Sequence, residues 1–487
     1  MNISRLEPLF QARSVALVGA STNRRKWGGI MLANLLNGGF TGRIYPVNPE
    51  AGEMLGQKVY KSVSAIPEAP DLAVIVVPAP AVVPVIRECV EKGIKAGVVI
   101  TAGFAELGAE GERLQRQMVE VARQGGMALV GPNCNGIMNP WKKLFVEFPN
   151  FHVPPGPLAV IAQSGNVVDV VARQLMIKGL GCSLCVASGN EADLHIEDYL
   201  EYLAEDPHTK VILCYVEGFK DGRRFFQIAR EVTKKKPVIV LKAGKTPAGA
   251  QAAASHTAAI AGADEIFAAV CKQSGIIRAG NLHEMVNIGI AFLRQPLPRG
   301  RRLGIVTAGG GWGVLAADAC MELGLDVVTL PEATLKELDA ILPAWWNRGN
   351  PVDLVAGSFA DSVFHAVEAV LACPAVDAVI FLSIMPALKI KRLASAAEKT
   401  QSESFGQELV QATSDVLDRI NVLARKYGKP VVVASEHLLA TAVQEAHVNY
   451  VLGQRGAVCY HMPHEAAEVM SALADYGEWR MKKGEGK

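Results

Sequence analysis

Short uninterrupted apolar runs recur along the sequence, and segments with helical periodicity separate them. The first runs are residues 14–19, 43–47, 72–78, 96–101 and 127–130. The helical segments between them are residues 31–37, 81–92 and 110–124. Strands that are apolar on both faces and alternate with helices are typical of a parallel sheet covered by helices on both sides. We therefore expect a Rossmann-like α/β domain over residues 1–145.

The same plan recurs twice, after a proline-rich joint at 149–157 and after residues 295–300. The second region has apolar runs at 158–162, 211–216 and 237–243, and a helical segment at 167–178. The third has apolar runs at 303–307, 376–384 and 430–435, and a helical segment at 314–323. Lys236-Pro237-Val238 and Lys429-Pro430-Val431 occupy matching places, which favours duplication over a chance likeness of α/β strands. We expect flavodoxin-like parallel-sheet domains at 155–295 and 300–475.

Charge and hydropathy exclude several classes of protein. The 487 residues include 49 basic and 48 acidic side chains, a net charge of +1, and half of all residues are hydrophobic. A chain of this composition folds into buried cores and has no overall field that attracts nucleic acid or an anionic membrane. The longest uncharged apolar stretch, residues 72–86, contains three prolines and is shorter than the roughly 20 residues of a spanning helix. We expect neither nucleic acid nor membrane as a partner.

The nine cysteines are scattered along the chain, which is typical of reduced, buried thiols in a cytoplasmic protein. Cys182 and Cys185 are the one close pair; a redox motif is the alternative to simple packing, and no second pair completes a zinc site. No apolar segment precedes residue 14, so we expect no secretory signal. These features predict a cytoplasmic protein without a bound metal.

The turn after the first apolar run has the features of a phosphate-binding loop. It contains Gly19 and Ser21, and Lys26 stands just before a helical segment, where backbone N–H groups can approach a phosphate. Arg24, Arg25 and Lys26 would neutralise phosphates, or they form a solvated basic turn. The fingerprint G-x-G-x-x-G is missing, and Asn48 stands where an NAD site places an acid. An NAD-dependent dehydrogenase is therefore disfavoured.

Two further turns, one containing Pro78 and the other Gly131-Pro132-Asn133, end strands of the same predicted sheet. Ligands of such folds bind at this edge. In order along the chain, these turns resemble the CoA-binding domain of succinyl-CoA synthetase. Over about residues 5–475 the chain is similar to α subunits of ADP-forming acyl-CoA synthetases. The resemblance implies that a Rossmann-like domain, followed by two domains like those of succinyl-CoA synthetase, binds coenzyme A through Gly19, Ser21, Lys26, Asn48, Pro78 and Asn133.

Residues 246–263 carry no charge and consist mostly of small side chains, with His256 among them. Such a segment suits a loop that moves or packs on another surface, although alanine favours helix and a lone histidine is usually structural. The resemblance implies that His256 is phosphorylated during turnover and that Glu217 orients its ring. Unaided, Glu217 is equally well read as a solvated loop carboxylate.

The turn Gln163-Ser164-Gly165-Asn166 opens a helix, whose free N–H groups suit a phosphoryl group. Ser164, Gly165 and Asn166 are therefore the expected phosphate site. At the matching turn of the third region the family has Gly-Gly-Pro-Gly, whereas this chain has Trp312, which leaves that turn without an assigned role. The stretch 350–353 also matches a family motif, and a turn-and-cap function is at least as good an explanation.

The resemblance implies an acid–CoA ligase: acyl-CoA + phosphate + ADP ⇌ carboxylic acid + CoA + ATP, through acyl-phosphate and phosphohistidine intermediates. The sequence has no P-loop, since Lys242–Thr246 resembles only its tail, and no unassigned segment is long enough for an ATP-grasp domain. We therefore expect an ATP-grasp β subunit, in an α2β2 assembly, to hold ADP or ATP with Mg²⁺. A non-catalytic CoA-binding regulatory or sensor subunit is the alternative. The small carboxylic acid is not readable from the sequence.

Overall fold

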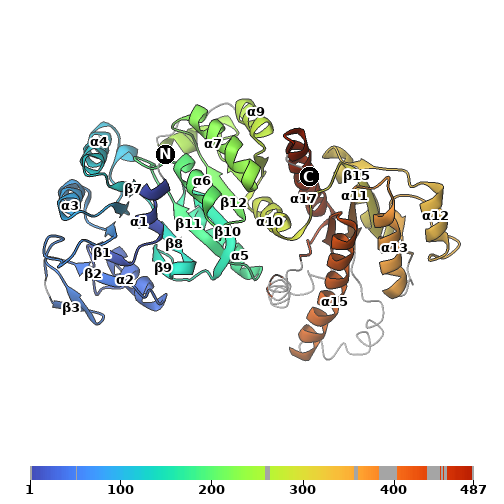
Figure 1. Ribbon diagram of the computed structural model, residues 1–487, viewed down its shortest axis with the longest axis horizontal. Coiled ribbons are helices and arrows are strands. Elements are labelled where there is room, and N and C mark those ends of the chain that lie inside the picture. The colour runs from blue at the N-terminus through green and yellow to red at the C-terminus, as the bar shows by residue number, and fades with distance from the viewer. Residues whose placement is uncertain are drawn as a thin grey trace. The chain divides into compact units, whose positions relative to one another are not determined.

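The computed structural model describes residues 3–50, 52–257, 264–355, 360–382, 403–435, 450, 453 and 458–484. The chain divides into two compact units. The first comprises Met1–Gln174 and Gly181–Arg278, and the second comprises Leu175–Leu180 and Ala279–Lys487. In Figure 1 the first unit runs from blue to green and most of the second from yellow to red.

The first sheet of the first unit has five parallel strands in the order β2-β1-β5-β6-β7. Their bounds are β1 (Ser14–Val18), β2 (Arg43–Val47), β5 (Leu72–Ile75), β6 (Ala96–Val99) and β7 (Ala128–Val130). The connecting helices are α2 (Trp27–Asn37), α3 (Ala79–Lys92) and α4 (Ala109–Gln124), and a small hairpin pairs β3 (Gly52–Met54) with β4 (Gln57–Val59). Strand order reverses between β1 and β5, and such a switch point opens a crevice at the carboxyl ends of the strands.

The second sheet of this unit has seven strands in the order β14-β13-β12-β10-β11-β8-β9. Five of them are parallel: β10 (Pro155–Ala162), β11 (Cys182–Ala187), β12 (Val211–Val216), β13 (Val238–Lys242) and β14 (Ile277–Arg278). They have the flavodoxin order, in which the first strand lies between the second and the third. The antiparallel hairpin of β8 (Gly136–Asn139) and β9 (Leu144–Glu147) pairs with β11 and extends this sheet.

Helices surround the second sheet, and they are α5 (Gly165–Ile177), α6 (Ile196–Glu205), α7 (Gly222–Lys235), α8 (Pro247–Thr257) and α9 (Asp264–Ser274). Helices α6 and α7 lie side by side on the sheet (Figure 1). One continuous apolar core joins the two sheets: it includes Leu17 of β1, Val130 of β7, Ile161 of β10 and Tyr199 of α6. The N-terminal segments η1 (Ile3–Arg5) and α1 (Glu7–Phe10) add Leu9 and Phe10 to that core.

The second unit contains a third parallel sheet, ordered β16-β15-β18-β19, with β17 also paired to β15. The strands are β15 (Arg302–Thr307), β16 (Asp326–Val327), β17 (Val352–Asp353), β18 (Ala378–Leu382) and β19 (Val431–Ala434). Its helices include α10 (Leu282–Arg294), α11 (Gly310–Glu322), α12 (Glu332–Asp339), α13 (Ala360–Ala372), α15 (Glu403–Tyr427) and α17 (Pro463–Lys482). Strand β15 lies between β16 and β18, as β10 lies between β11 and β12 in the second sheet. The prediction of two flavodoxin-like sheets is therefore confirmed.

All nine cysteines lie in the described part of the chain, and each is free and buried. Cys182 and Cys185 both belong to strand β11, where they pack in the core. Among the described helices, none combines the length and the apolar character needed to cross a bilayer.

Candidate active site

The turn after β1 is held by close backbone contacts. Gly19 has a φ of 93°, and a Cβ built on it would lie 2.2 Å from the carbonyl oxygen of Val76. A Cβ on Gly28, at the start of α2, would lie 2.0 Å from the carbonyl oxygen of Gly19. Only glycine fits at both places, because any side chain would meet backbone. The start of α2 is therefore pressed onto the turn.

Three predicted residues support or flank this turn. The Asn48 side chain donates to the carbonyl oxygen of Ala20 (2.8 Å) and accepts from the backbone N–H of Glu50. Ser21 is half-buried and accepts from the N–H of Asn23. Lys26 is the exposed N-cap residue of α2 and makes no side-chain capping bond. Asn48 thus braces the turn, and the Lys26 ammonium lies beside the first turn of a helix, where an anion is favoured.

A cavity of about 430 Å³ opens beyond the carboxyl ends of β5, β6 and β7. It is lined by Trp27, Val76, Val77, Pro78, Ile100, Thr101, Ala102, Asn133, Cys134, Asn135 and Phe148. Pro78 and Asn133 were predicted from the sequence and meet in this cavity. The backbone of Asn133 is tied to the neighbouring strand end, because its N–H donates to the carbonyl oxygen of Thr101 (2.9 Å). Burial raises the pKa of Cys134 to about 12, so its thiol stays protonated.

The cavity reaches the predicted phosphate turn through Asn135. A Cβ built on Gly165, the first residue of α5, would lie 2.0 Å from Cγ of Asn135. Ser164 and Gly165 are half-buried and Asn166 is exposed, so all three predicted phosphate residues lie at the open start of a 13-residue helix. Asn135 therefore belongs both to the cavity wall and to the α5 N-terminus.

One half-buried and one buried carboxyl group, those of Asp169 and Glu147, lie behind Asn135. The Asn135 amide donates to Asp169 of α5 (3.4 Å). Burial raises the pKa of Asp169 to about 6, against the effects of Arg173 and Asn135. Burial, together with the charge of Asp169, raises the pKa of Glu147 well above its usual range. The Glu147 carboxyl therefore resists ionisation, whereas a pKa of about 6 leaves most of Asp169 ionised at pH 7.

Gln163 connects the phosphate turn with Glu217. Its Oε1 accepts from the backbone N–H groups of Glu217 (2.6 Å) and Gly218 (3.1 Å). Its Nε2 donates to the carboxylate of Glu191 (2.9 Å) and to the carbonyl oxygen of Gly218 (2.8 Å). Glu217 follows β12, directly beside the end of β10, and its side chain is buried. Three of these hydrogen bonds fix the start of the loop that carries Glu217, and the fourth anchors Gln163 to Glu191.

Glu191 is the buried carboxyl that anchors Gln163. It also accepts from the Ser188 hydroxyl (2.7 Å). Burial raises the pKa of Glu191 to about 7, although the hydrogen bonds from Ser188 and Gln163 act in the opposite direction. Glu191 thus has a pKa near neutral pH and is hydrogen-bonded to Gln163, the first residue of the predicted phosphate turn. A carboxyl group in such a position is typical of a functional site.

The described structure includes the backbone of His256 but not its side chain. The backbone lies in α8, so the helical alternative for this alanine-rich segment is correct for residues 247–257. Helix α8 contacts η2 (Ala105–Leu107), which follows β6 at the cavity end of the first sheet. The side-chain position of His256, and its distance from Glu217, lie outside the described residues.

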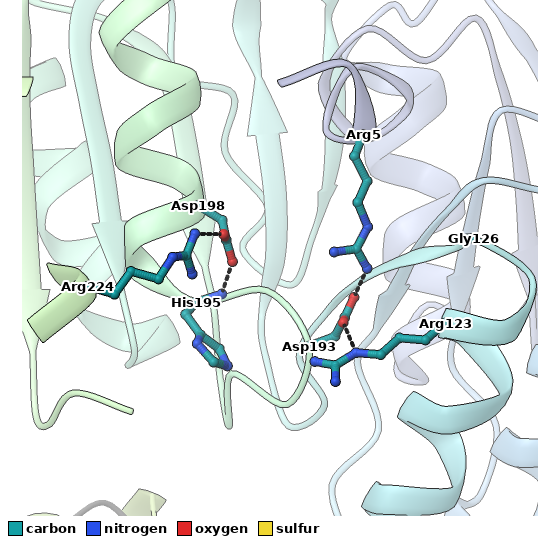
Figure 2. A pocket seen from close by; sticks show the side chains of 7 residues that line it. All are labelled: Arg5, Arg123, Gly126, Asp193, His195, Asp198 and Arg224. Atoms are coloured by element: carbon teal, nitrogen blue, oxygen red, sulfur yellow. Dashed lines mark hydrogen bonds and ion pairs between the residues drawn. The ribbon is translucent and has the colours of Figure 1, made fainter. Parts of the chain in front are cut away.

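A second pocket, of about 470 Å³, lies where the first two sheets meet, and its charged side chains are already paired. Figure 2 shows Arg5 and Arg123 converging on the fully buried Asp193, with distances of 2.6 and 2.9 Å. Asp193 also accepts from the backbone N–H of Leu129 in β7 (3.1 Å). On the other side of the pocket, Arg224 pairs with Asp198, which caps α6. This cluster fastens the loop of Glu191 to the first sheet.

Sequence reasoning missed Asn135, Glu191, Trp27 and Phe148. One signal was available for Glu191: Ser188-Gly-Asn190 repeats the tripeptide of the predicted phosphate turn, and it also follows an apolar strand. The Asn190 amide nitrogen donates to the Glu106 carboxylate (2.6 Å). The Asn190 side-chain oxygen accepts from the Asn133 amide nitrogen (3.2 Å). The repeated tripeptide therefore links the two sheets at the site.

Three protein-family models match the chain in succession. A CoA binding domain matches residues 13–140, a succinyl-CoA ligase like flavodoxin domain matches 155–292, and a Ligase-CoA domain matches 303–472.

Whole-chain comparisons agree with these matches. The α subunit of acetate–CoA ligase [ADP-forming] I of Pyrococcus furiosus is 39% identical over 99% of both chains. Acetate–CoA ligase [ADP-forming] I of Archaeoglobus fulgidus is 41% identical over 74% of this chain and 52% of the relative. The dinucleotide-forming acetyl-coenzyme A synthetase 1 of Ca. Korarchaeum cryptofilum, solved in complex with phosphate and ADP, superposes with a TM-score of 0.83 at 34% identity, over 98% of each chain.

Proposed function

This chain belongs to the family of ADP-forming acyl-CoA ligase α subunits, and from that premise we propose how its residues divide the work. The reaction is acyl-CoA + phosphate + ADP ⇌ carboxylic acid + CoA + ATP. Residues 1–145 bind CoA, residues 155–295 carry the phosphorylated histidine, and residues 300–475 form the second flavodoxin-like domain. The observation that carries the proposal is the contact of Asn135 with Gly165, which joins the cavity to the phosphate turn.

Coenzyme A would lie in the crevice of the first sheet. The close backbone approach at Gly19 and the Lys26 ammonium at the start of α2 suit its phosphates. Ser21 and Asn48 hold that turn, and Pro78 and Asn133 line the cavity for the uncharged arm. The fit is supported by the lining, since none of the described side chains around the cavity is charged.

Phosphate would bind at Ser164, Gly165 and Asn166, where the α5 N-terminus favours negative charge. Its oxygen attacks the thioester carbonyl carbon, the C–S bond breaks, and the thiolate leaves as acyl phosphate forms. His256 Nε2 then attacks phosphorus and the P–O bond to the acyl group breaks, which releases the carboxylate. Glu217 would accept a hydrogen bond from the other ring nitrogen and fix the tautomer. Its backbone is already held by Gln163.

The phosphoryl group then passes from His256 to ADP on a partner chain. The Pyrococcus furiosus relative is named a subunit, and the region that the Archaeoglobus fulgidus relative shares with this chain is 52% of its length. Both facts support a second component, which we propose is an ATP-grasp β subunit that holds ADP or ATP with Mg²⁺ in an α2β2 assembly. We place the enzyme in the cytoplasm; the nine free, buried thiols of the described chain support that placement.

A phosphorylation experiment tests the proposal. The chain and its co-purifying partner are incubated with radiolabelled ATP, and the label is followed through acid and base. We expect acid-labile, base-stable label that is lost in His256→Ala and retained in His208→Ala, a control at an exposed histidine outside this segment. Glu217→Gln should slow the labelling without abolishing it. Label that persists in His256→Ala would reject the phosphohistidine, and a chain that binds CoA without labelling would favour a regulatory subunit.

A further inference from the structure

We propose that the second pocket, where the first two sheets meet, binds a small polyanion that carries phosphate or carboxylate groups. No step of the proposed reaction uses this pocket, so the inference is independent of the ligase mechanism. Three arginines from separate elements line it: Arg5 of η1, Arg123 of α4 and Arg224 of α7. Its volume of about 470 Å³ is in the usual range of small-molecule sites.

The carboxylates of this pocket are buried, whereas its guanidinium groups reach the solvent. The side chains of Asp193 and Asp198 are 0% and 2% exposed. Those of Arg5, Arg123 and Arg224 are 29%, 59% and 31% exposed. A molecule that enters the hollow therefore meets cationic surface, because the negative charges contribute almost no exposed area.

The two arginines paired with Asp193 keep hydrogen-bond donors for a ligand. A guanidinium has five N–H donors in a planar fork. In the described part of the chain, Arg5 donates to Asp193 from one amine nitrogen (2.6 Å), and Arg123 donates to it from Nε (2.9 Å). Asp193 is itself held by the backbone N–H of Leu129. It therefore fixes two guanidinium groups beside each other and leaves most of their N–H groups available.

Positive groups stand on two sides of the hollow. Figure 2 shows His195 and Arg224 on one side, and Arg5 and Arg123 on the other. Burial lowers the pKa of His195, so its imidazole is neutral at pH 7 and offers one N–H donor. Cations on opposite sides favour a ligand with more than one negative charge, because a single charge neutralises only one side. Guanidinium forks bind phosphate and carboxylate alike, so both kinds of polyanion suit this chemistry.

A bound polyanion would steady the loop that carries Glu191. Asp193 lies two residues beyond Glu191, whose carboxylate accepts from Gln163 of the phosphate turn. A ligand that contacts Arg5 and Arg123 binds only while both still hold Asp193. By mass action it stabilises that closed arrangement, and with it the anchor of the phosphate turn. The ligand is therefore expected to act as an effector.

The test uses the full chain with inorganic pyrophosphate and, as a second probe, tricarballylate, a tricarboxylate. Each is titrated at constant ionic strength into wild type, Arg123→Gln and Arg116→Gln, and the NMR signal of His195, assigned with His195→Gln, gives the Kd. Arg116 is a matched control, because it lies on the same helix α4, is similarly exposed and pairs with Glu112.

In wild type, a bound polyanion should raise the pKa of His195, because a nearby negative charge favours the imidazolium. Arg123→Gln should raise the Kd about tenfold or more, the order expected for lost charge-assisted hydrogen bonds. Arg116→Gln should leave the Kd unchanged. A tighter response to pyrophosphate identifies a phosphate-bearing ligand and a tighter response to tricarballylate a polycarboxylate, and each supports the site.

Two results would overturn the proposal. One is a His195 signal that responds to neither probe in wild type, even if calorimetry detects pyrophosphate bound elsewhere on the chain. The other is equal weakening in Arg123→Gln and Arg116→Gln, because the attraction would then come from diffuse surface charge. If circular dichroism shows Arg123→Gln to be unfolded, Arg5→Gln takes its place with the same expectation.

Discussion

Replacing Glu191 by glutamine should make stability depend less on pH. The glutamine carbonyl oxygen can accept from Gln163, and its amide can donate to the Ser188 hydroxyl, so the hydrogen bonds of the site survive. What changes is the charge. Glu191 is fully buried, and burial raises its pKa from the ordinary 4.5 to about 7. The native state therefore favours the protonated carboxyl more than the unfolded chain does.

The sign and the size follow from linkage. Because the folded pKa is the higher one, the stability contributed by the protonated carboxyl is complete below pH 4.5, declines from there to pH 7, and is lost above. The difference between the two pKa values, at about 1.4 kcal/mol for each factor of ten, amounts to about 3 kcal/mol. Glu197, Asp198 and Lys220 interact electrostatically with Glu191, but all three are unchanged in the variant.

The assay compares wild type and Glu191→Gln by urea unfolding at pH 5 and pH 8. Amide exchange in β10, β11 and β12 is followed, since a chain of several domains need not unfold in one step. Relative to wild type, the variant should gain about 2.5 kcal/mol in unfolding free energy between pH 5 and pH 8, somewhat less than the full difference because pH 5 already lies above the ordinary pKa of 4.5. Glu120→Gln, at an exposed carboxylate, should show no such gain. A difference between wild type and Glu191→Gln that is equal at both pH values would refute the buried-carboxyl argument.

Two further changes test the connections around the site. Asp193→Asn removes the charge that Arg5 and Arg123 share and should lower the unfolding free energy, measured in urea, by about 2 kcal/mol. The control Glu110→Gln, at an exposed ion pair with Arg113, should leave the unfolding free energy unchanged. Equal effects of the two changes would contradict a buried role for Asp193. Gly165→Ala places a Cβ 2.0 Å from Asn135 and should lower kcat/KM for phosphate more than tenfold in the complete enzyme. Asn135→Gly in the same chain should restore part of that loss, whereas an active Gly165→Ala variant would show that the contact is not needed.

The parallel strands were predictable because each is a local apolar run of several residues between helices. Residues 43–47 and 211–216 match β2 and β12 in both bounds. The β8–β9 hairpin was not predicted: its pairing with β11 joins segments on either side of the proline-rich joint, and no local pattern reports such a pairing. Strands β16 and β17 have two residues each, too few for any periodicity.

The site was predictable only in part, for a similar reason. Turns at strand ends carry recognisable residues, which is how Pro78, Asn133 and the Ser164 turn were found. The residues that join those turns, such as Asn135 and Glu191, work through contacts between different loops. Trp27 and Phe148, whose rings stack at the cavity, are 121 positions apart in the sequence, and an isolated aromatic residue carries no sign of its stacking partner.

The two flavodoxin-like sheets also explain why only one of them would hold phosphate. In the second sheet, the first residue of α5 faces the neutral amide of Asn135. In the third sheet, a Cβ on Gly310, the first residue of α11, would lie 2.9 Å from a carboxylate oxygen of Asp353. The Asp353 carboxylate therefore already lies at the positive end of the α11 dipole, and it would repel a second anion there.

The same contact gives a physical role to the stretch 350–353, which sequence reasoning left unassigned. Asn350 accepts from the N–H of Ile305 and donates to the carbonyl oxygens of Leu303 and Val328, which fixes β15. Asp353 then completes the pairing of β17 with Thr307. The motif therefore shapes the strand and fills the helix end with a fixed charge. Under the proposed function, an amide at the helix start of one copy and a carboxylate at that of the other would favour phosphate at the second sheet.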